Sequence, residues 1–290
     1  MMNTGIDHRH LDEHRFAIIN PLQVDRSQWA GLPVAALMPA GVSAKPDSVP
    51  HLLALDALGE SDRIDLLVRA DVWDRVNDHP FFSMLLRSQA DASRLALHLS
   101  RQLTVTIPEG GRALLRWYDP RVLRHLRWLI TPAQWRVLGG PVTAWTWRDA
   151  QRQWHTHEST GEPAPISSLR PTAGQWAVIG RLGVLNRTLA QLRRNAPGLV
   201  LDDAACQRID GLLRQAFDDL GLTDEADARL FAEQGMRYHR DVYRHPAIEQ
   251  RLALARDQQV TYVGACADLD PTTLSGWKPE PDLQRRESCT

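Results

Sequence analysis

The chain has 290 residues, 43% of them hydrophobic, and a formal net charge of -1. This length suffices to bury one substantial core or two modest ones, and the balanced charge excludes a general electrostatic attraction to nucleic acid or membranes. No stretch approaches the roughly 18 uncharged apolar residues that cross a bilayer, and the first residues lack the basic-then-apolar order of a secretory signal. The three cysteines have neither disulfide nor zinc-site spacing. We therefore expect a cytoplasmic protein that makes no membrane contact.

Residues 1–165 alternate short apolar runs with amphipathic stretches, which predicts an α+β domain with a mixed α/β-sheet. Strands are expected where these runs occur: 16–20, 34–38, 51–55, 81–86 and 142–147. Residues 103–107 alternate cleanly between apolar and polar side chains, which predicts a strand. A Gly-rich turn leads from them to a hairpin partner at 113–118.

Two amphipathic helices are expected between these strands. Residues 58–76 carry a helical stripe of the kind that faces a core, and residues 90–102 form a helix that buries Ala92, Leu95 and Leu99. The stripe of the first helix consists of Ile64, Leu67, Val68, Val72 and Val76.

Two further helix starts are especially clear. Asp119-Pro120 places an N-capping acid before a proline at the first helical position, where the missing N–H costs nothing. Thr131-Pro132 repeats this arrangement, and Gln134 completes a capping box.

The pattern changes to helices in the second half, which predicts an all-helical C-terminal lobe at 166–290. The Ser-, Pro- and Gly-rich segment 159–171 is the expected linker. Cys206 falls on the apolar side of its helix, which suits an inert core thiol. After Asp270 the chain is polar, and a disordered tail is expected. The expected helices are 175–194, 202–220, 224–237 and 247–257.

Two histidine clusters are the only patterns that resemble metal sites. The first has the wrong spacing and no preceding strand, so a mobile polar terminus is expected there. The second, His155 and His157, lacks a third ligand and reads as an exposed strand end. The first cluster consists of His8, His10, Asp12 and His14.

Patterns typical of catalysis are missing as well. The chain has only two lysines, Lys45 and Lys278, and neither belongs to a phosphate-binding loop. No nucleophile-elbow motif occurs. We therefore predict no catalytic, cofactor-binding or metal-ligating residues and no enzymatic activity.

Arginines alternate with tryptophans between residues 112 and 154. Three interpretations are open: the tryptophans fill the core, the segment forms a protein interface, in which Trp and Arg are enriched, or it binds single-stranded nucleic acid by stacking and phosphate contact. An acid-rich segment at 202–227 has the opposite charge, and the two segments either attract each other, attract two different partners, or are solvated helix faces. The six tryptophans are Trp117, Trp128, Trp135, Trp145, Trp147 and Trp154.

A distinctive order of motifs runs through 114–126 (LLRWYDPRVLRHL), 129–138 (LITPAQWRVL) and 140–145 (GPVTAW). A strand ending in R-x-Y-D-P-R, a helix, a T-P-x-Q helix and a G-P-V strand are similar to the type VI secretion effector-adaptor family, and the resemblance covers roughly residues 14–147. It implies a cytoplasmic adaptor chaperone, not an enzyme, that binds one cognate toxin effector and delivers it to the spike protein VgrG.

The candidate partner-binding residues belong to this motif and the helix after it. The helical arginines fall near one face, opposite Val122, Leu126 and Leu129, and this row either meets an acidic partner or is solvated. Asp119 has a structural role as the cap and is placed to pair with two of the arginines. The alternative function is an Arg/Trp-rich single-stranded nucleic-acid-binding protein, although nucleic acid is not the partner we expect. The candidates are Arg116, Trp117, Arg121, Arg124 and Arg127.

Overall fold

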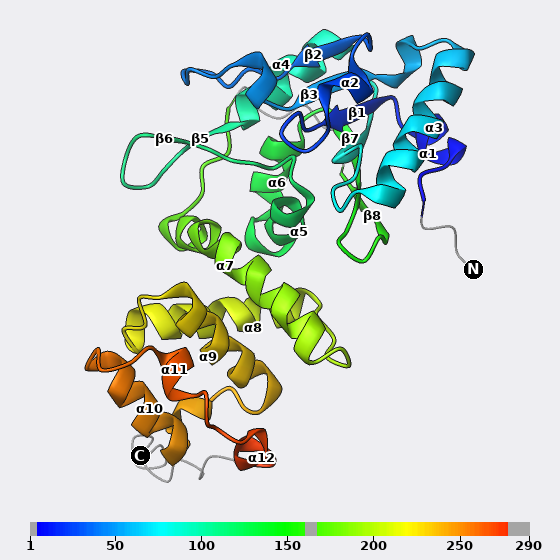
Figure 1. Cartoon of the computed structure of the whole chain (residues 1–290). Coiled ribbons are helices and arrows are strands. Elements are labelled where there is room, and N and C mark those ends of the chain that lie inside the picture. The colour runs from blue at the N-terminus through cyan, green and yellow to red at the C-terminus, as the bar shows by residue number, and fades with distance from the viewer. Residues whose placement is uncertain (1–4, 160–166, 278–290) are drawn as a thin grey trace, which may run out of the picture. The chain divides into compact units, whose positions relative to one another are not determined.

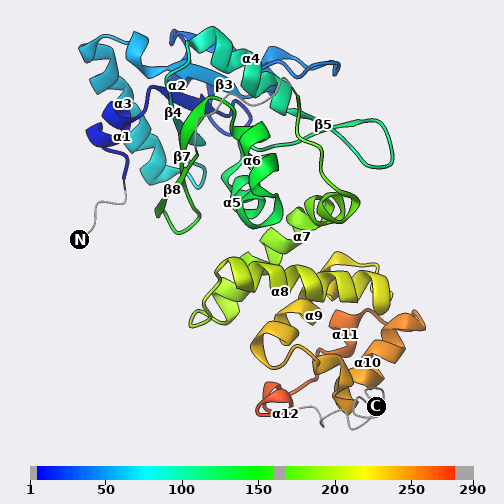
Figure 2. The same cartoon turned by 180° about the vertical axis from the view of Figure 1, so that it is seen from behind.

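The computed structural model describes residues 5–159 and 167–277. The chain divides into two compact units, residues 1–176 and 177–290 (Figures 1 and 2). The sequence places this boundary at 165, whereas in the structure it lies later, inside helix α7 (Ala173–Asn195). The central part of the expected linker, 160–166, and most of the expected tail, 278–290, lie outside the described residues. Helices predominate over strands, which confirms the α+β class.

The N-terminal unit is built on a six-stranded antiparallel sheet with the order β2-β3-β1-β4-β7-β8. All five apolar runs expected as strands contribute to it. The fourth run begins its strand three residues later than expected, at Met84, because Phe81 and Phe82 pack into the core before the strand starts. The strands are β1 (Phe16–Ile19), β2 (Val34–Ala36), β3 (His51–Ala54), β4 (Met84–Ser88), β7 (Val142–Arg148) and β8 (Trp154–Glu158).

The expected hairpin forms a separate two-stranded sheet, β5 (Thr104–Thr106) and β6 (Arg112–Leu114). The prediction of a return strand as far as residue 118 was wrong in its second half. Pairing with β5 ends at Leu114, and Trp117 and Tyr118 turn into the core instead.

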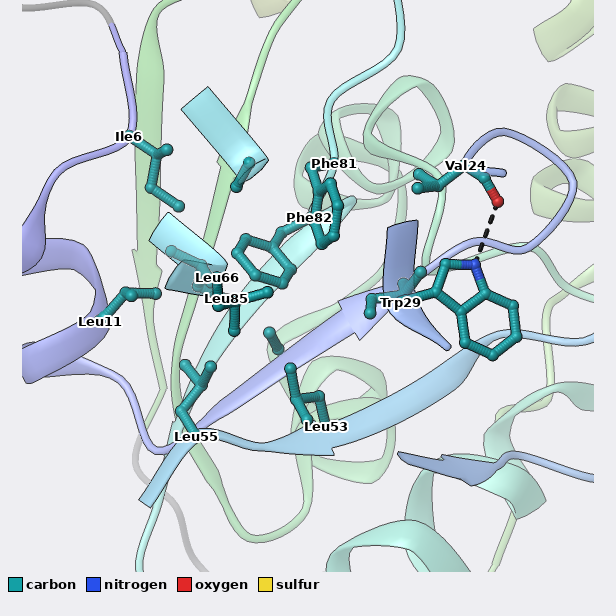
Figure 3. Packing of buried hydrophobic residues seen from close by; sticks show 13 residues of the cluster. Ile6, Leu11, Val24, Trp29, Leu53, Leu55, Leu66, Phe81, Phe82 and Leu85 are labelled. Atoms are coloured by element: carbon teal, nitrogen blue, oxygen red, sulfur yellow. Dashed lines mark hydrogen bonds between the residues drawn. The ribbon is translucent and has the colours of Figure 1, made fainter. Parts of the chain in front are cut away.

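The register of the large sheet separates two apolar faces. Phe16, Leu86 and Trp145 lie side by side on one face, and their chain neighbours Ala17, Leu85 and Thr146 lie on the other. The second face packs against helices α1, α2 and α3 in a continuous cluster that includes Leu66 (Figure 3). On the first face, Trp145 contacts Trp117, which lies just before α5, and Trp135 of α6. These contacts place the start of α5 and helix α6 against this face. The helices of this unit are α1 (His8–Glu13), α2 (Arg26–Trp29), α3 (Glu60–Val76), α4 (Ala92–Gln102), α5 (Pro120–Leu129) and α6 (Pro132–Gly139).

Local capping sets the helix starts that the sequence makes clear. Asp119 accepts a hydrogen bond from the Arg121 N–H at the start of α5, and Thr131 and Gln134 form a complete capping box on α6. Gly140 then ends α6 with a φ of +51°, and a Cβ there would lie 2.3 Å from the His98 ring. Only glycine therefore fits this position. Short 3₁₀ turns occur at Pro46–Ser48 and Leu55–Ala57.

The C-terminal unit is helical, as expected. Cys206 is buried on α8, and Gly235 of α9 lies against Leu212 of α8, which allows these two helices to approach closely. No helix in the described residues has the length and apolar character needed to span a membrane. The elements that follow α7 are α8 (Asp203–Arg214), a π-helical turn (Gln215–Asp219), α9 (Glu225–Arg237), a 3₁₀ turn (Val242–Arg244), α10 (Pro246–Arg256), α11 (Tyr262–Ala265) and α12 (Pro271–Leu274).

Candidate protein-interaction surface

Trp117, the aromatic candidate of the R-W-Y-D-P-R motif, is a core residue. Its side chain is 0% exposed and meets Tyr118 and Trp145 edge to face, with ring centroids 5.9 and 5.5 Å apart. Such pairs add stability beyond the burial of their area. Its proposed role in partner contact is therefore corrected: the ring joins the loop before α5 to the sheet and offers no surface to a partner.

Asp119 is the electrostatic centre of the motif. Its buried carboxylate accepts two hydrogen bonds from the Arg121 guanidinium, at 3.0 and 2.8 Å, and pairs with Arg116 at 3.5 Å. Burial alone would raise the pKa of Asp119, but the hydrogen bonds and charge of Arg121, with a smaller contribution from Arg116, hold it below the ordinary value. The expected pairing of both arginines with Asp119 is confirmed.

The four candidate arginines have different surroundings. Arg116 and Arg121 meet on Asp119, with side chains 49% and 52% exposed. Arg124 is half-buried, and Arg127 lies over the Trp147 ring at 5.8 Å from its centroid. Much of this basic character is thus directed toward the protein's own Asp119 and Trp147, and the guanidinium groups of Arg116 and Arg121 remain half accessible.

The apolar side of α5 differs from the sequence prediction. Leu123, His125 and Leu126 form its buried side, whereas Val122 and Leu129 are only half-buried. Burial and the nearby Arg127 cation lower the pKa of His157 on β8.

The tryptophans of the Arg/Trp segment do not form a stacking platform. Nucleic-acid stacking requires exposed ring faces, and four of the six rings are core residues, with the remaining two half-buried. The core interpretation of the sequence therefore holds for most of them. The four buried rings are Trp117, Trp135, Trp145 and Trp147.

Helix α3 exposes an apolar row that the sequence assigned to the core. Leu66 and Ala70 are the apolar residues that this helix buries, and Leu67 alone of the expected stripe packs against the core. The other four face solvent. They are Ile64 (59% exposed), Val68 (56%), Val72 (56%) and Val76 (77%). We call these four residues the α3 row.

The side of the helix opposite the α3 row carries a buried ion pair beside Leu66 and Ala70. Asp74 accepts a hydrogen bond from the Arg148 guanidinium at 2.7 Å and another from the Phe81 N–H at 2.8 Å. Both charged side chains are buried. Because α3 carries apolar residues on both sides, periodicity alone does not identify the buried one. The signal that was available is the occurrence of apolar residues on two opposite sides of α3, since the side that is not buried then exposes an apolar patch, which indicates a second contact.

Charged side chains border the α3 row. Arg69 pairs with Asp65 at 2.8 Å, and Arg75 pairs with Asp71. Within the described residues, Glu60, Asp62 and Asp78 make no ion pair, so the border carries an excess of negative charge. An apolar centre with a charged rim is the usual anatomy of a protein interface.

The side chains of the first histidine cluster take part in helix capping and core contacts. His10 and Asp7 cap α1, and His14 is buried, where it bonds to the Thr146 hydroxyl at 2.8 Å. The expectation of a mobile polar terminus was wrong, because this capped helix continues directly into β1. Among the described residues, no group of three or more His, Cys, Asp or Glu side chains is arranged to hold a metal ion.

Comparison with known proteins bears on the segment that carries these features. Residues 43–137 match the family model of a domain of unknown function, DUF4123. This family is associated with type VI secretion effectors. The match spans about a third of the chain, less than the expected resemblance, and it includes both α3 and the R-W-Y-D-P-R motif. No curated protein and no solved structure matches the chain significantly.

Proposed function

We propose that this chain is an adaptor chaperone that binds a cognate type VI secretion effector and assists its loading onto the VgrG spike. The observation that carries this proposal is the family match over 43–137, which contains the motif that suggested the adaptor family from sequence. In this role the protein acts in the cytoplasm, without catalysis, through a surface that is complementary to another polypeptide.

Two features of the N-terminal unit support a binding role. The motif residues Trp117 and Asp119 stabilise the scaffold internally, so the surface remains available for recognition. The α3 row lies in the same matched segment and exposes four apolar side chains without a contact that explains them.

Co-purification tests the proposal directly. The full chain is co-expressed with the toxin encoded beside its gene, and separately with the neighbouring spike protein, and each pair is purified at mild salt. A stable complex with the toxin is the expected result. If neither protein co-purifies, the proposal fails.

A rival nucleic-acid-binding function makes a different prediction. It requires tight binding of a single strand that weakens steeply with salt. Because most tryptophan rings of the basic segment are buried, we expect a flat titration with labelled single-stranded DNA at low salt.

A further inference from the structure

The α3 row has no role in the folding of its own helix. Val and Ile have lower helix propensity than Ala, Leu or Glu, because a helix restricts their χ1 rotation. At positions that are 56–77% exposed they gain little burial that offsets this. Four such residues at a constant spacing of four are therefore unfavourable for the isolated helix, and an intermolecular contact accounts for them.

The row has the shape that a partner helix requires. Residues 64, 68, 72 and 76 form one ridge along α3, about 18 Å long at 1.5 Å per residue. Ridges of residues four apart are the ones that interdigitate when two helices pack. The branched side chains are also rotationally restricted before binding, so that little entropy is lost when they are covered.

The charge around the row selects the partner. Along the row, the charges of Asp65 and Arg69 neutralise each other, and so do those of Asp71 and Arg75. The ends remain acidic, with Glu60 and Asp62 before the row and Asp78 after it. Glu60 and Asp62 also suit the helix dipole, but Asp78, beyond the C-terminal end, does not. A partner with basic residues at both ends fits this pattern.

A second copy of the chain fits less well. Antiparallel packing of two α3 helices would bring Glu60 and Asp62 of one copy toward Asp78 of the other. Parallel packing would bring identical acids together. Like charges in either arrangement oppose the contact. Four side chains also fall well short of the roughly 20–30 residues a side of a stable dimer interface.

We propose that the α3 row is the docking site for an amphipathic α-helix of a protein partner, a helix with an apolar ridge and basic residues at both ends. This inference rests on the proposed function, because it names the part of the cargo that the adaptor holds. Its tests are nevertheless separate, since a model peptide probes the row without the toxin.

The probe is a fluorescein-labelled amphipathic peptide with leucine at every third or fourth position, alanine between them and lysines at both ends. Its anisotropy is measured with the full chain at concentrations up to about 100 μM. The Val68→Asp/Val72→Asp variant is expected to bind at least tenfold more weakly. Leu97→Asp is the matched control, because Leu97 is an equally exposed apolar residue on another helix of the same unit, and it should bind as the wild type does.

A second peptide, with glutamates in place of the terminal lysines, tests the charge argument. It is expected to bind at least fivefold more weakly than the lysine peptide at low salt, and the difference should shrink as salt rises. Equal binding of the two peptides, equal binding by the double variant, or no binding by the wild type overturns the proposal.

Two measurements exclude other occupants. The melting temperature of Val68→Asp/Val72→Asp should stay within a few degrees of the wild type, because exposed substitutions change stability little. A large drop would mean that this chain itself covers the row, which contradicts the proposal. Sedimentation velocity should show a monomer for both proteins. A wild-type dimer that the variant loses would make a second copy the occupant and overturn it.

The toxin experiment separates this inference from the proposed function. If the wild type binds the toxin and the double variant binds it equally well, the docking site is wrong and the adaptor function stands. If the lysine peptide binds at the row and neither the toxin nor the spike protein co-purifies, the docking site stands and the adaptor function fails.

Discussion

Helices α3 and α5 belong to the same unit and use their surfaces in opposite ways. Helix α5 buries Leu123 and Leu126, and its arginines are used largely within the protein, since Arg121 bonds to Asp119 and Arg127 lies over the Trp147 ring. Helix α3 buries Asp74 and directs the α3 row outward. The conspicuous residues of the motif thus mainly hold the scaffold together. The residues offered to a partner are apolar ones that look like core in the sequence.

The largest effect is expected for Trp117, which joins the motif to the sheet. Trp117→Ala should lower the free energy of unfolding of the N-terminal unit by about 3–5 kcal/mol, because it opens a cavity among packed rings. Urea unfolding followed by tryptophan fluorescence measures it, since nine of the ten tryptophans lie in this unit. Trp128→Ala, at a half-buried position of α5, should cost clearly less. If Trp117→Ala and Trp128→Ala lowered the free energy of unfolding equally, Trp117 would not be the core residue described here and would again be a candidate for partner contact.

Breaking the buried Asp74–Arg148 pair of α3 should lower the free energy of unfolding nearly as much. Arg148→Ala leaves the Asp74 carboxylate buried without its cation, which should cost about 3–5 kcal/mol at neutral pH. Replacing both residues, as in Asp74→Leu/Arg148→Met, should recover much of that loss, because no unpaired charge remains. A double variant as unstable as the single one would show that the loss in Arg148→Ala does not come from an unpaired buried charge.

This deficit should depend on pH. Burial already raises the pKa of Asp74, and removing Arg148 raises it further. The folded variant then holds this proton more tightly than the unfolded chain does, so its stability falls as pH rises through the folded pKa. The loss relative to wild type should therefore be smaller at pH 5 than at pH 7. A loss that stays constant with pH would mean that Asp74 is solvated in the variant.

Asp119 should show an intermediate effect with the opposite pH dependence. Asp119→Ala removes a helix cap and both arginine pairs, at a cost of about 2–4 kcal/mol. Asp119→Asn keeps the cap and should cost less. Because the folded pKa of Asp119 lies below its ordinary value, its stabilisation is complete above the unfolded pKa and is lost as pH falls through the folded one. Acid unfolding of the wild type and of Asp119→Asn should therefore converge at low pH.

The smallest effect is expected on the α3 row. Val68→Ala and Val72→Ala should change the unfolding free energy by less than about 0.5 kcal/mol, or stabilise slightly, since Ala has the higher helix propensity. Thermal unfolding measures this. Leu66→Ala on the buried side of the same helix is the contrast and should cost about 2–5 kcal/mol. Comparable losses on the two sides would remove the distinction between them.

The sequence predicts those parts of the fold that depend on neighbouring residues. The starts of α5 and α6 follow from Asp119-Pro120 and from the Thr131–Gln134 capping box, which act within one turn. Alternation of apolar residues predicts β5, and short apolar runs predict the strands of the large sheet. Cys206 was correctly placed in the core.

Sequence patterns do not predict those features of the fold that depend on contacts between residues far apart in the chain. Asp74 is buried because Arg148, 74 residues later, lies opposite it, and no local pattern contains that pairing. Asp74 lies on the same side of α3 as Leu66 and Ala70, so the pair marks the buried side and leaves the α3 row on the opposite one. Trp117 could not be assigned either, since only the register that brings Trp145 beneath it makes it a core residue.

Hydrogen exchange on the full chain, with and without the toxin encoded beside its gene, shows which helix the toxin covers. We expect toxin binding to slow exchange along α3, residues 60–76, and to leave α5, residues 120–129, unchanged. Slower exchange along α5 with no change along α3 would contradict it, because the motif arginines and not the apolar row would then form the contact.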